Sequence, residues 1–248
     1  MKKRISILLV ICMLFSISIL SIPVNAQGSE FVGASDEDVP FDLDAEIEKI
    51  MNDARYTDKQ KEIFVDKLLG KKLNLPIRKS QIYLAPYNQE YNWSCGAAVA
   101  RTTLKYITGN DPGEAAMRNY MGITQNASPT IEQVRSCLNA KQSRNSYSVV
   151  TVTSASQLTS AVESCVYSFN CPAVLLIATN TTGLTNTFGY SSKGHFVNAT
   201  GRIGTSYGYN IKIADPYRSW KGLTPTYEVN ANTVYDAIRQ HAQKKMAW

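Results

Sequence analysis

The sequence predicts an α+β fold, and two observations along its 248 residues support this prediction. Apolar residues recur with helical spacing through most of the stretch from about residue 94 to about residue 169. Short strand-like stretches bounded by turn residues then follow one another from about residue 172 to about residue 231. Helices that come mostly first, followed by a run of adjacent strands, are typical of α+β proteins.

Capping and stop residues locate the expected helices. Residues 57–60 have the capping-box pattern, and Gly70 and Gly109 are natural helix-stop residues. Ser128 is expected to cap a helix whose first residue is Pro129. We therefore expect helices at about residues 42–55, 57–69, 94–107, 128–140, 156–169 and 232–245.

Strand-like stretches make up the rest of the expected fold. The stretches GHFVNATG and YNIKIADP are expected to form an antiparallel hairpin that turns near residues 204–208. The polar residues 179–193 just before this hairpin either border a cleft or form an ordinary surface loop. Five strands are expected in all: SYSVVTV from Ser146, PAVLLIAT from Pro172, GHFVNATG from Gly194, YNIKIADP from Tyr209 and TYEVNA from Thr226.

Residues 1–26 have the three parts of a secretory signal peptide. A basic start precedes an apolar run over residues 5–22, and the small-residue pattern Val24-Asn25-Ala26 follows Pro23. An uncleaved membrane anchor is the alternative, because the apolar run approaches the length of a membrane span. Pro23 and the small residues favour cleavage. We expect a protein secreted by a bacterium, with no stable membrane anchoring once the signal is removed.

Residues 27–79 differ in charge from the remainder of the chain. A polar stretch that extends to about residue 40 is expected to be disordered, and two acidic amphipathic helices and a basic, proline-containing linker follow it. The helices carry too little apolar surface to form a core of their own. This order resembles a secreted zymogen, with a pro-segment at 27–79 and the main domain at 80–248. The alternatives are a permanent part of the fold or an arm that docks a partner.

Charge and histidine content exclude two classes of partner. The formal net charge is +6, but the basic half has no compact run of Lys and Arg and no alternation with aromatic residues. Because such a footprint is expected of nucleic-acid binding, no nucleic-acid partner is predicted. The chain has two histidines, and no cysteine pair has zinc-ligand spacing. We therefore expect neither a metal nor another cofactor.

Four cysteines follow the signal peptide, and their contexts differ. Cys165 and Cys171 flank a short loop after a helix, so a disulfide between them is one prediction for an exported chain. Cys137 lies on the apolar side of its helix, as expected of a buried thiol. Cys95, in QEYNWSCGAAVARTTLKYITG, has three open interpretations: buried structural thiol, half of a disulfide, or nucleophile. A helix N-terminus favours the last, because its dipole lowers the pKa of a thiol.

Three further residues would complete a cysteine active site. His195 opens a strand, whereas His241 lies in a polar terminal helix and is expected to be solvated. Asp215 ends the next strand of the expected hairpin, so its carboxylate can lie beside the imidazole and orient it. Gln89, six positions before Cys95, can supply a side-chain amide to an oxyanion hole. Each also has a structural alternative: a strand-start histidine, an Asp-Pro turn and a surface glutamine.

The combination of Q-x-x-x-x-x-C-G at the start of a helix, GHFVNATG and IADPY, in that order, resembles papain-fold cysteine peptidases. Within them it is most similar to the bacterial branch related to bacteriocin-leader (double-glycine leader) peptidases, over about residues 81–220. The resemblance implies a papain-like two-lobe fold. An N-terminal helical lobe would carry Cys95, and an antiparallel sheet lobe would carry His195 and Asp215 across a cleft.

The same resemblance implies roles for the site residues. Cys95 would be the nucleophile, His195 the general base and acid, Asp215 the orienting carboxylate and Gln89 the oxyanion donor. Leader peptidases are usually fused to transporter membrane domains, which we do not expect here. We therefore expect a free secreted endopeptidase that acts on a peptide or protein through a thioester acyl-enzyme. It would be made as a zymogen, with its own pro-segment as intramolecular inhibitor, and would act as a monomer.

Two alternatives of other classes remain at this point. A transglutaminase-like acyltransferase would use the same three residues to transfer an acyl group to an amine instead of to water. A non-catalytic papain-like module would bind a ligand without using them. An intact set of cysteine, histidine and aspartate favours an enzyme over the binding module.

Overall fold

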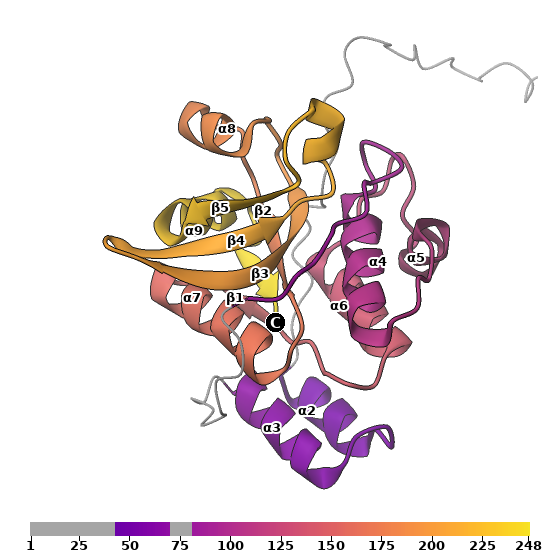
Figure 1. Cartoon of the computed structure of the whole chain (residues 1–248). Helices are drawn as coiled ribbons and strands as arrows, with labels where there is room; N and C mark the ends of the chain where they lie inside the picture. Colours follow the sequence, from indigo (N-terminus) through magenta and orange to yellow (C-terminus); the bar gives the residue numbers. More distant parts are fainter. Residues whose placement is uncertain (1–42, 70–80) are drawn as a thin grey trace, which may run out of the picture.

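The computed structural model describes residues 43–69 and 81–248 (Figure 1). The expected signal peptide, the basic linker and the stop residue Gly70 lie outside the described residues. The helices are α2 (Leu43–Asn52), α3 (Asp58–Leu68), α4 (Cys95–Thr108), α5 (Glu114–Met121), α6 (Ile131–Lys141), α7 (Ala155–Glu163), α8 (Thr182–Phe188) and α9 (Ala231–Gln240), with the short helices η1 (Ser164–Ser168) and η2 (Arg218–Lys221). The strands are β1 (Val149–Thr151), β2 (Ala173–Ile177), β3 (His195–Thr205), β4 (Gly208–Ala214), β5 (Thr226–Asn230) and β6 (Lys245–Ala247).

One antiparallel sheet holds all six of these strands, in the order β1-β6-β2-β3-β4-β5. The central strand β2 is a continuous apolar run, AVLLI, and is buried along its whole length. Strands β3 and β4 form the expected hairpin, with Thr205 paired to Gly208 across the turn. Gly208 has a φ of 118°, a conformation that disfavours residues with a side chain. The mixture of helices and antiparallel sheet confirms the predicted α+β class.

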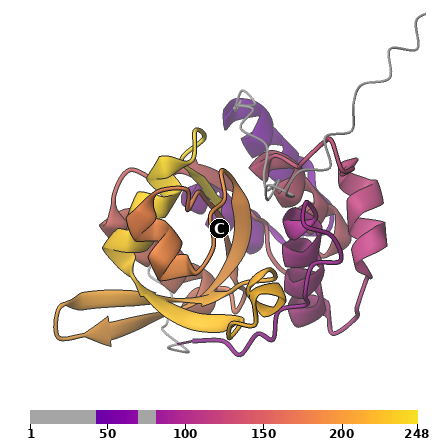
Figure 2. The ribbon, with the colours of Figure 1, turned by 90° about the horizontal axis from the view of Figure 1, so that it is seen from above.

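Helices α4, α5 and α6 form a lobe beside the sheet, and α7 and α9 pack against the sheet itself (Figures 1 and 2). The contact between α4 and β3 joins the two lobes. At Gly96 an added Cβ would lie 2.5 Å from Cγ of Pro129 and 3.2 Å from Cδ2 of Phe196, so only glycine allows this approach. Farther along, the Asn198 side-chain amide donates to the Thr103 hydroxyl at 2.9 Å. The start of α4 is therefore fixed against the start of β3.

Helices α2 and α3 form a separate hairpin at one end of the molecule (Figure 1). The expected capping box at its second helix is present: the Thr57 N–H donates to Gln60 Oε1 at 2.9 Å, and the Gln60 N–H donates to Thr57 Oγ1 at 3.3 Å. Its apolar side chains form a cluster distinct from the main core, with Phe169 packed against it. The residues of this small cluster are Ile50, Tyr56, Phe64 and Leu68.

Several element boundaries differ from the expected ones. Helix α6 is capped by Thr130, which forms a capping box with Gln133, and not by Ser128. The helix expected over 156–169 changes to a π-helix, η1, after Glu163, and the last helix ends at Gln240. Helices α5 and α8 and strand β6 were not expected; β6 adds the chain end to the sheet between β1 and β2. None of the helices within residues 43–69 and 81–248 is long and apolar enough to cross a bilayer.

Candidate active site

Cys95 is the first residue of α4 and is fully buried. The chain just before it is held in a tight turn. The Ser94 hydroxyl donates to the Tyr91 carbonyl and accepts from the Tyr91 N–H, each at 3.0 Å. The buried carboxylate of Glu114 accepts from the N–H of Glu90 at 3.1 Å, which ties the turn to α5. These contacts fix the helix start and hence the position of the Cys95 thiol.

His195 is the first residue of β3, where it pairs with Ile177 of β2, and it too is fully buried. Its Nε2 lies 2.9 Å from Oδ1 of Asp215. The Cys95 side chain lies near enough to the imidazole to raise its pKa. Because Nε2 is directed at Asp215, an interaction with the thiol would fall to Nδ1. The imidazole therefore lies between the thiol of the helical lobe and the carboxylate of the sheet lobe.

The pKa of His195 is raised to about 9. Burial alone would lower it, since an apolar environment disfavours the imidazolium. The charge of Asp215 and its hydrogen bond outweigh this, and the Cys95 side chain adds to their effect. A pKa of about 9 favours the cationic form of the ring at neutral pH, close to the Cys95 side chain.

Asp215 directly follows β4 and accepts four hydrogen bonds at its carboxylate. Oδ1 accepts from His195 Nε2 and from the Tyr217 N–H, each at 2.9 Å. Oδ2 accepts from the hydroxyls of Tyr190 at 2.6 Å and Tyr227 at 3.0 Å. Burial acts to raise the pKa of Asp215, but the His195 charge and these donors lower it overall. The hairpin thus brings His195 and Asp215 together as the sequence predicted.

Gln89 lies between the turn before Cys95 and the residue after Asp215. Its side-chain Nε2 donates to the Tyr91 carbonyl at 2.6 Å, and its N–H donates to the Pro216 carbonyl at 3.1 Å. The side chain is buried, contrary to the surface-glutamine alternative. A primary amide has a second hydrogen to donate. The oxyanion role of Gln89 remains a prediction.

Sequence reasoning missed the tyrosines around Asp215. Tyr190 contributes both a hydroxyl to the carboxylate and a ring whose centroid lies 5.2 Å from that of His195, at 83° between the planes. The ring of Tyr217 also packs on His195, with centroids 6.1 Å apart. Their closeness in sequence to His195 and Asp215 was the available signal. Tyr227 carries no such signal, because only the β4–β5 pairing brings it near.

The other histidine and the other cysteines have structural settings. His241 was expected to be solvated, but it is buried: it caps α9, and its Nδ1 accepts from the Gln243 N–H at 3.2 Å. Cys137 is buried as expected, with its Sγ 3.6 Å from Sδ of Met117, and burial raises its pKa to about 12. Within the described residues, Cys165 and Cys171 are thiols rather than a disulfide, although the Cys171 N–H donates to the Cys165 carbonyl at 3.0 Å.

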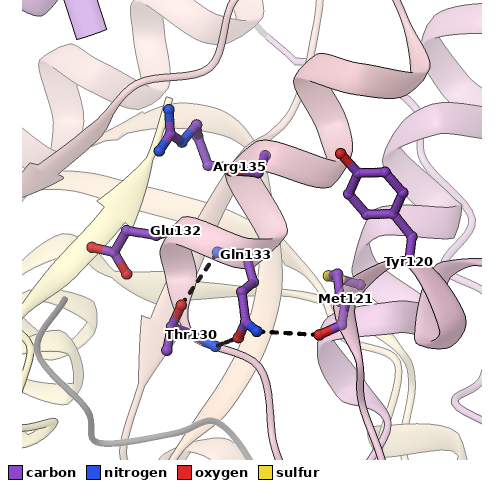
Figure 3. A pocket seen from close by; sticks show the side chains of 7 residues that line it. Tyr120, Met121, Thr130, Glu132, Gln133 and Arg135 are labelled. Atoms are coloured by element: carbon purple, nitrogen blue, oxygen red, sulfur yellow. Dashed lines mark hydrogen bonds between the residues drawn. The ribbon is translucent and has the colours of Figure 1, made fainter. Parts of the chain in front are cut away.

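Two hollows of the surface lie away from these residues. One cavity of about 530 Å³ lies between α5 and the start of α6, bordered by Tyr120, Glu132 and Arg135 (Figure 3). Another, of about 540 Å³, lies between α8 and α9. Cys95, His195 and Asp215 are all fully covered in this structure. Among residues 43–69 and 81–248, no group of three or more His, Cys, Asp or Glu side chains could hold a metal ion.

No protein-family model and no curated protein matches the sequence. Among solved structures, the chain is similar to the peptidase domain of Streptococcus ComA, a bi-functional ABC transporter involved in quorum sensing. The identity is 12%, the TM-score is 0.44, and the match covers 67% of this chain and 97% of that one. It is also similar to the proform of the ragweed pollen allergen Amb a 11, a cysteine protease, at 14% identity and a TM-score of 0.45, over 70% of this chain and 66% of that one.

Proposed function

We propose that this chain is a secreted cysteine endopeptidase that acts through a thioester acyl-enzyme. The observation that carries the proposal is the arrangement of three buried groups at the junction of the two lobes. The Cys95 side chain lies near His195 and raises its pKa, and His195 Nε2 is 2.9 Å from the Asp215 carboxylate. A helix-start cysteine, an imidazole near it and a carboxylate bonded to the imidazole have the roles that nucleophilic catalysis needs.

The proposed reaction uses each group in turn. The reaction starts with the shared proton on His195 and Cys95 as the thiolate, and the thiolate attacks the peptide carbonyl carbon to form a tetrahedral intermediate. When this intermediate collapses to a thioester, the imidazolium gives the proton to the departing amine. Water, deprotonated by His195, then attacks the thioester, which releases the acid and restores the thiol. Asp215 keeps the ring oriented and stabilises its cationic form throughout.

The oxyanion of that intermediate needs donors close to Cys95. Cys95 is the first residue of α4. The first N–H groups of a helix have no partner within that helix, so the Cys95 N–H is a candidate donor. The Gln89 amide, with one hydrogen directed at the Tyr91 carbonyl, would supply the second donor. Because Cys95 and His195 are fully covered, substrate binding also requires the groups above them to move.

We further propose that residues 27–79 act as a pro-segment. The α2–α3 hairpin docks through a small apolar contact with Phe169 and a few polar contacts: Glu46 pairs with Arg135 of α6, and Arg55 donates to the carbonyls of Asn139 and Gln142. An acidic helix on a basic surface would be weakened by salt and by protonation of its carboxylates. Such contacts suit a unit that must later leave.

The docking surface of the hairpin lies far from the thiol. Arg144, just after α6, donates to the carbonyl of Ile107 near the end of α4. Ile107 is twelve residues along α4 from Cys95, which corresponds to about 18 Å of helix. The hairpin would therefore anchor the pro-segment, and inhibition would come from the chain that continues beyond it.

Peptide cleavage by the secreted chain tests the main proposal. Incubation with a diverse peptide library should give cleaved products with the unchanged chain and with Cys137→Ala, and none with Cys95→Ala. Products joined to an added amine, in place of hydrolysed ones, would identify an acyltransferase instead. No products under any condition, with Cys95 inert toward thiol-directed epoxides, would favour the binding module.

A charge exchange tests the pro-segment proposal. Glu46→Arg should weaken inhibition by residues 27–79 added in trans to the processed domain, because it faces Arg135 with a like charge. The matching Arg135→Glu variant of the domain should restore inhibition by the Glu46→Arg segment. A segment that never inhibits the processed domain would show that the hairpin is a permanent or partner-docking part of the fold.

A further inference from the structure

Two tyrosine hydroxyls from distant parts of the chain meet at one oxygen of the Asp215 carboxylate. Tyr190 follows α8 and donates to Oδ2 at 2.6 Å, and Tyr227 comes from β5 and donates to the same atom at 3.0 Å. Tyr190 is buried and Asp215 is fully buried. A buried carboxylate is costly to ionise unless donors satisfy its lone pairs. The two hydroxyls meet this need at the oxygen that does not face His195.

The two oxygens of Asp215 are thus assigned to different tasks. Oδ1 accepts from His195 Nε2 and from the Tyr217 N–H, and Oδ2 accepts from the two tyrosines. Four donors around one carboxylate fix the plane of the group. Rotation that would turn Oδ1 away from the imidazole would break bonds at Oδ2 as well.

The tyrosines are themselves held in place. Arg218 stacks over the ring of Tyr227, 3.7 Å from its centroid, and donates to the carbonyls of Phe188 and Thr224. The Thr179 hydroxyl donates to the carbonyl of Tyr190 at 2.7 Å. The two hydroxyls are therefore directed at Asp215 by contacts from α8, η2 and the chain after β2.

We propose that Tyr190 and Tyr227 are positioning residues, whose hydroxyls hold Asp215 ionised and oriented so that His195 stays directed at Cys95. Tyr190 also restricts the movement of the imidazole, because its ring packs edge-on against that of His195. The catalytic meaning of this clamp depends on the proposed function, whereas its effect on the Asp215–His195 pair does not.

The sign of the effect follows from which form of Asp215 the hydroxyls bind. Both donate to the carboxylate, so both favour its charged form. The hydrogen bond from Tyr190 is among the contacts that lower the pKa of Asp215. The other groups that face it are His195 from β3, with Cys95 from α4 behind the ring, and Arg218 from η2 over Tyr227. Removal of either hydroxyl leaves these in place and should raise the pKa of Asp215.

Histidine-selective NMR of the secreted chain, residues 27–248, tests the clamp. The chain has two histidines, so His241 serves as an internal reference for the acid titration of the His195 signals. The change of the His195 signals at low pH reports the protonation of Asp215. In Tyr190→Phe and in Tyr227→Phe this change should move to higher pH, because the proton affinity of Asp215 should rise about tenfold in each variant. The double variant should move further, and His241 should not move.

Tyr147→Phe is the matched control. Its hydroxyl is also buried and donates to the Pro172 carbonyl at 2.8 Å, so its loss should lower the melting temperature without moving the His195 transition. Transitions of both clamp variants that coincide with the unchanged chain would overturn the proposal, and so would an equal shift in Tyr147→Phe. If Tyr190→Phe does not fold, the half-buried Tyr227 still decides the matter. A shift in a chain that cleaves no peptide would refute the peptidase and retain the clamp.

Discussion

Cys95 at the start of α4 and Cys137 within α6 lie on neighbouring helices of one lobe, and both are fully buried. The groups around the two sulfurs differ. Cys137 faces Met117, and burial raises its pKa to about 12, so it stays a thiol at neutral pH. Cys95 lies near His195, whose pKa is raised to about 9 mainly by Asp215 against the effect of burial. Burial alone therefore does not indicate what a cysteine does; the neighbouring charge does.

Replacement of the His195 imidazole should have the largest effect on the difference between Cys95 and Cys137. His195→Gln should lower peptide cleavage and Cys95 alkylation by about 10²–10⁴-fold, because the proton acceptor of Cys95 is gone. Alkylation of Cys137 should stay as slow as before. His241→Gln is the matched control, since it removes the other buried imidazole without touching Cys95. Equal losses in the two variants would mean that the effect comes from folding and not from the site.

The Asp215–His195 pair should also be visible in the pH dependence of stability. An unfolded histidine has a pKa of about 6.5, and the folded value is about 9, so the pair contributes stability that is fully present below about pH 6.5. That contribution, up to about 3 kcal/mol, is lost as pH rises through 9. Urea unfolding of the unchanged chain at pH 6, 7.5 and 9.5 should show this fall.

The comparison chain for that measurement is His195→Gln. Its free energy of unfolding should lack the fall between pH 6.5 and 9, so the difference between the two chains should shrink as pH rises. Parallel curves across this range would show that His195 is not stabilised as a cation by Asp215.

Gly96→Ala should disturb the Cys95 end of α4 directly. Its Cβ would lie 2.5 Å from Cγ of Pro129, just before α6, and 3.2 Å from Cδ2 of Phe196 in β3, so α4 must shift away from both, at a cost of about 1–3 kcal/mol. Gly183→Ala in α8 meets nothing within 4 Å and should instead be neutral or slightly stabilising. Thermal unfolding together with cleavage rates would check both; an active, fully stable Gly96→Ala chain would contradict the close packing.

Cys137→Ala should leave peptide cleavage unchanged and affect stability only. It removes one buried sulfur and leaves a small cavity beside Met117, which should cost about 1–2 kcal/mol. Cleavage rates measured well below the melting temperature should equal those of the unchanged chain. A large loss of activity without unfolding would assign Cys137 a role that its surroundings do not indicate.

The sequence predicts elements well where local rules decide them. The β3–β4 hairpin, the capping box at Thr57 and the stop at Gly109 are examples, because each depends on a few adjacent residues. The cap of α6 could have been predicted by the same rule: Thr130 has a glutamine three positions later, whereas Ser128 has an isoleucine. Strand β6 could not, since three residues gain their strand conformation only from pairing with β1 and β2.

The candidate site shows the same division. His195 and Asp215 could be paired from the hairpin alone, and Cys95 from its place at a helix start. Tyr227 reaches Asp215 only through the order of the sheet, and the burial of His241 depends on how the chain end packs. Contacts between distant segments carry no periodicity that a single sequence displays.

Thiol-directed epoxide labelling, followed by mass spectrometry of each cysteine, tests the central claim most directly. The chain of residues 27–248 is labelled near pH 7, both whole and processed by removal of residues 27–79, with Cys137 as the internal reference. Because the two thiols are equally buried, burial predicts equally slow labelling of both. The triad predicts that Cys95 is labelled at least about a hundredfold faster than Cys137 in the processed chain, and that His195→Gln abolishes the difference. Equal rates at Cys95 and Cys137 would contradict the account.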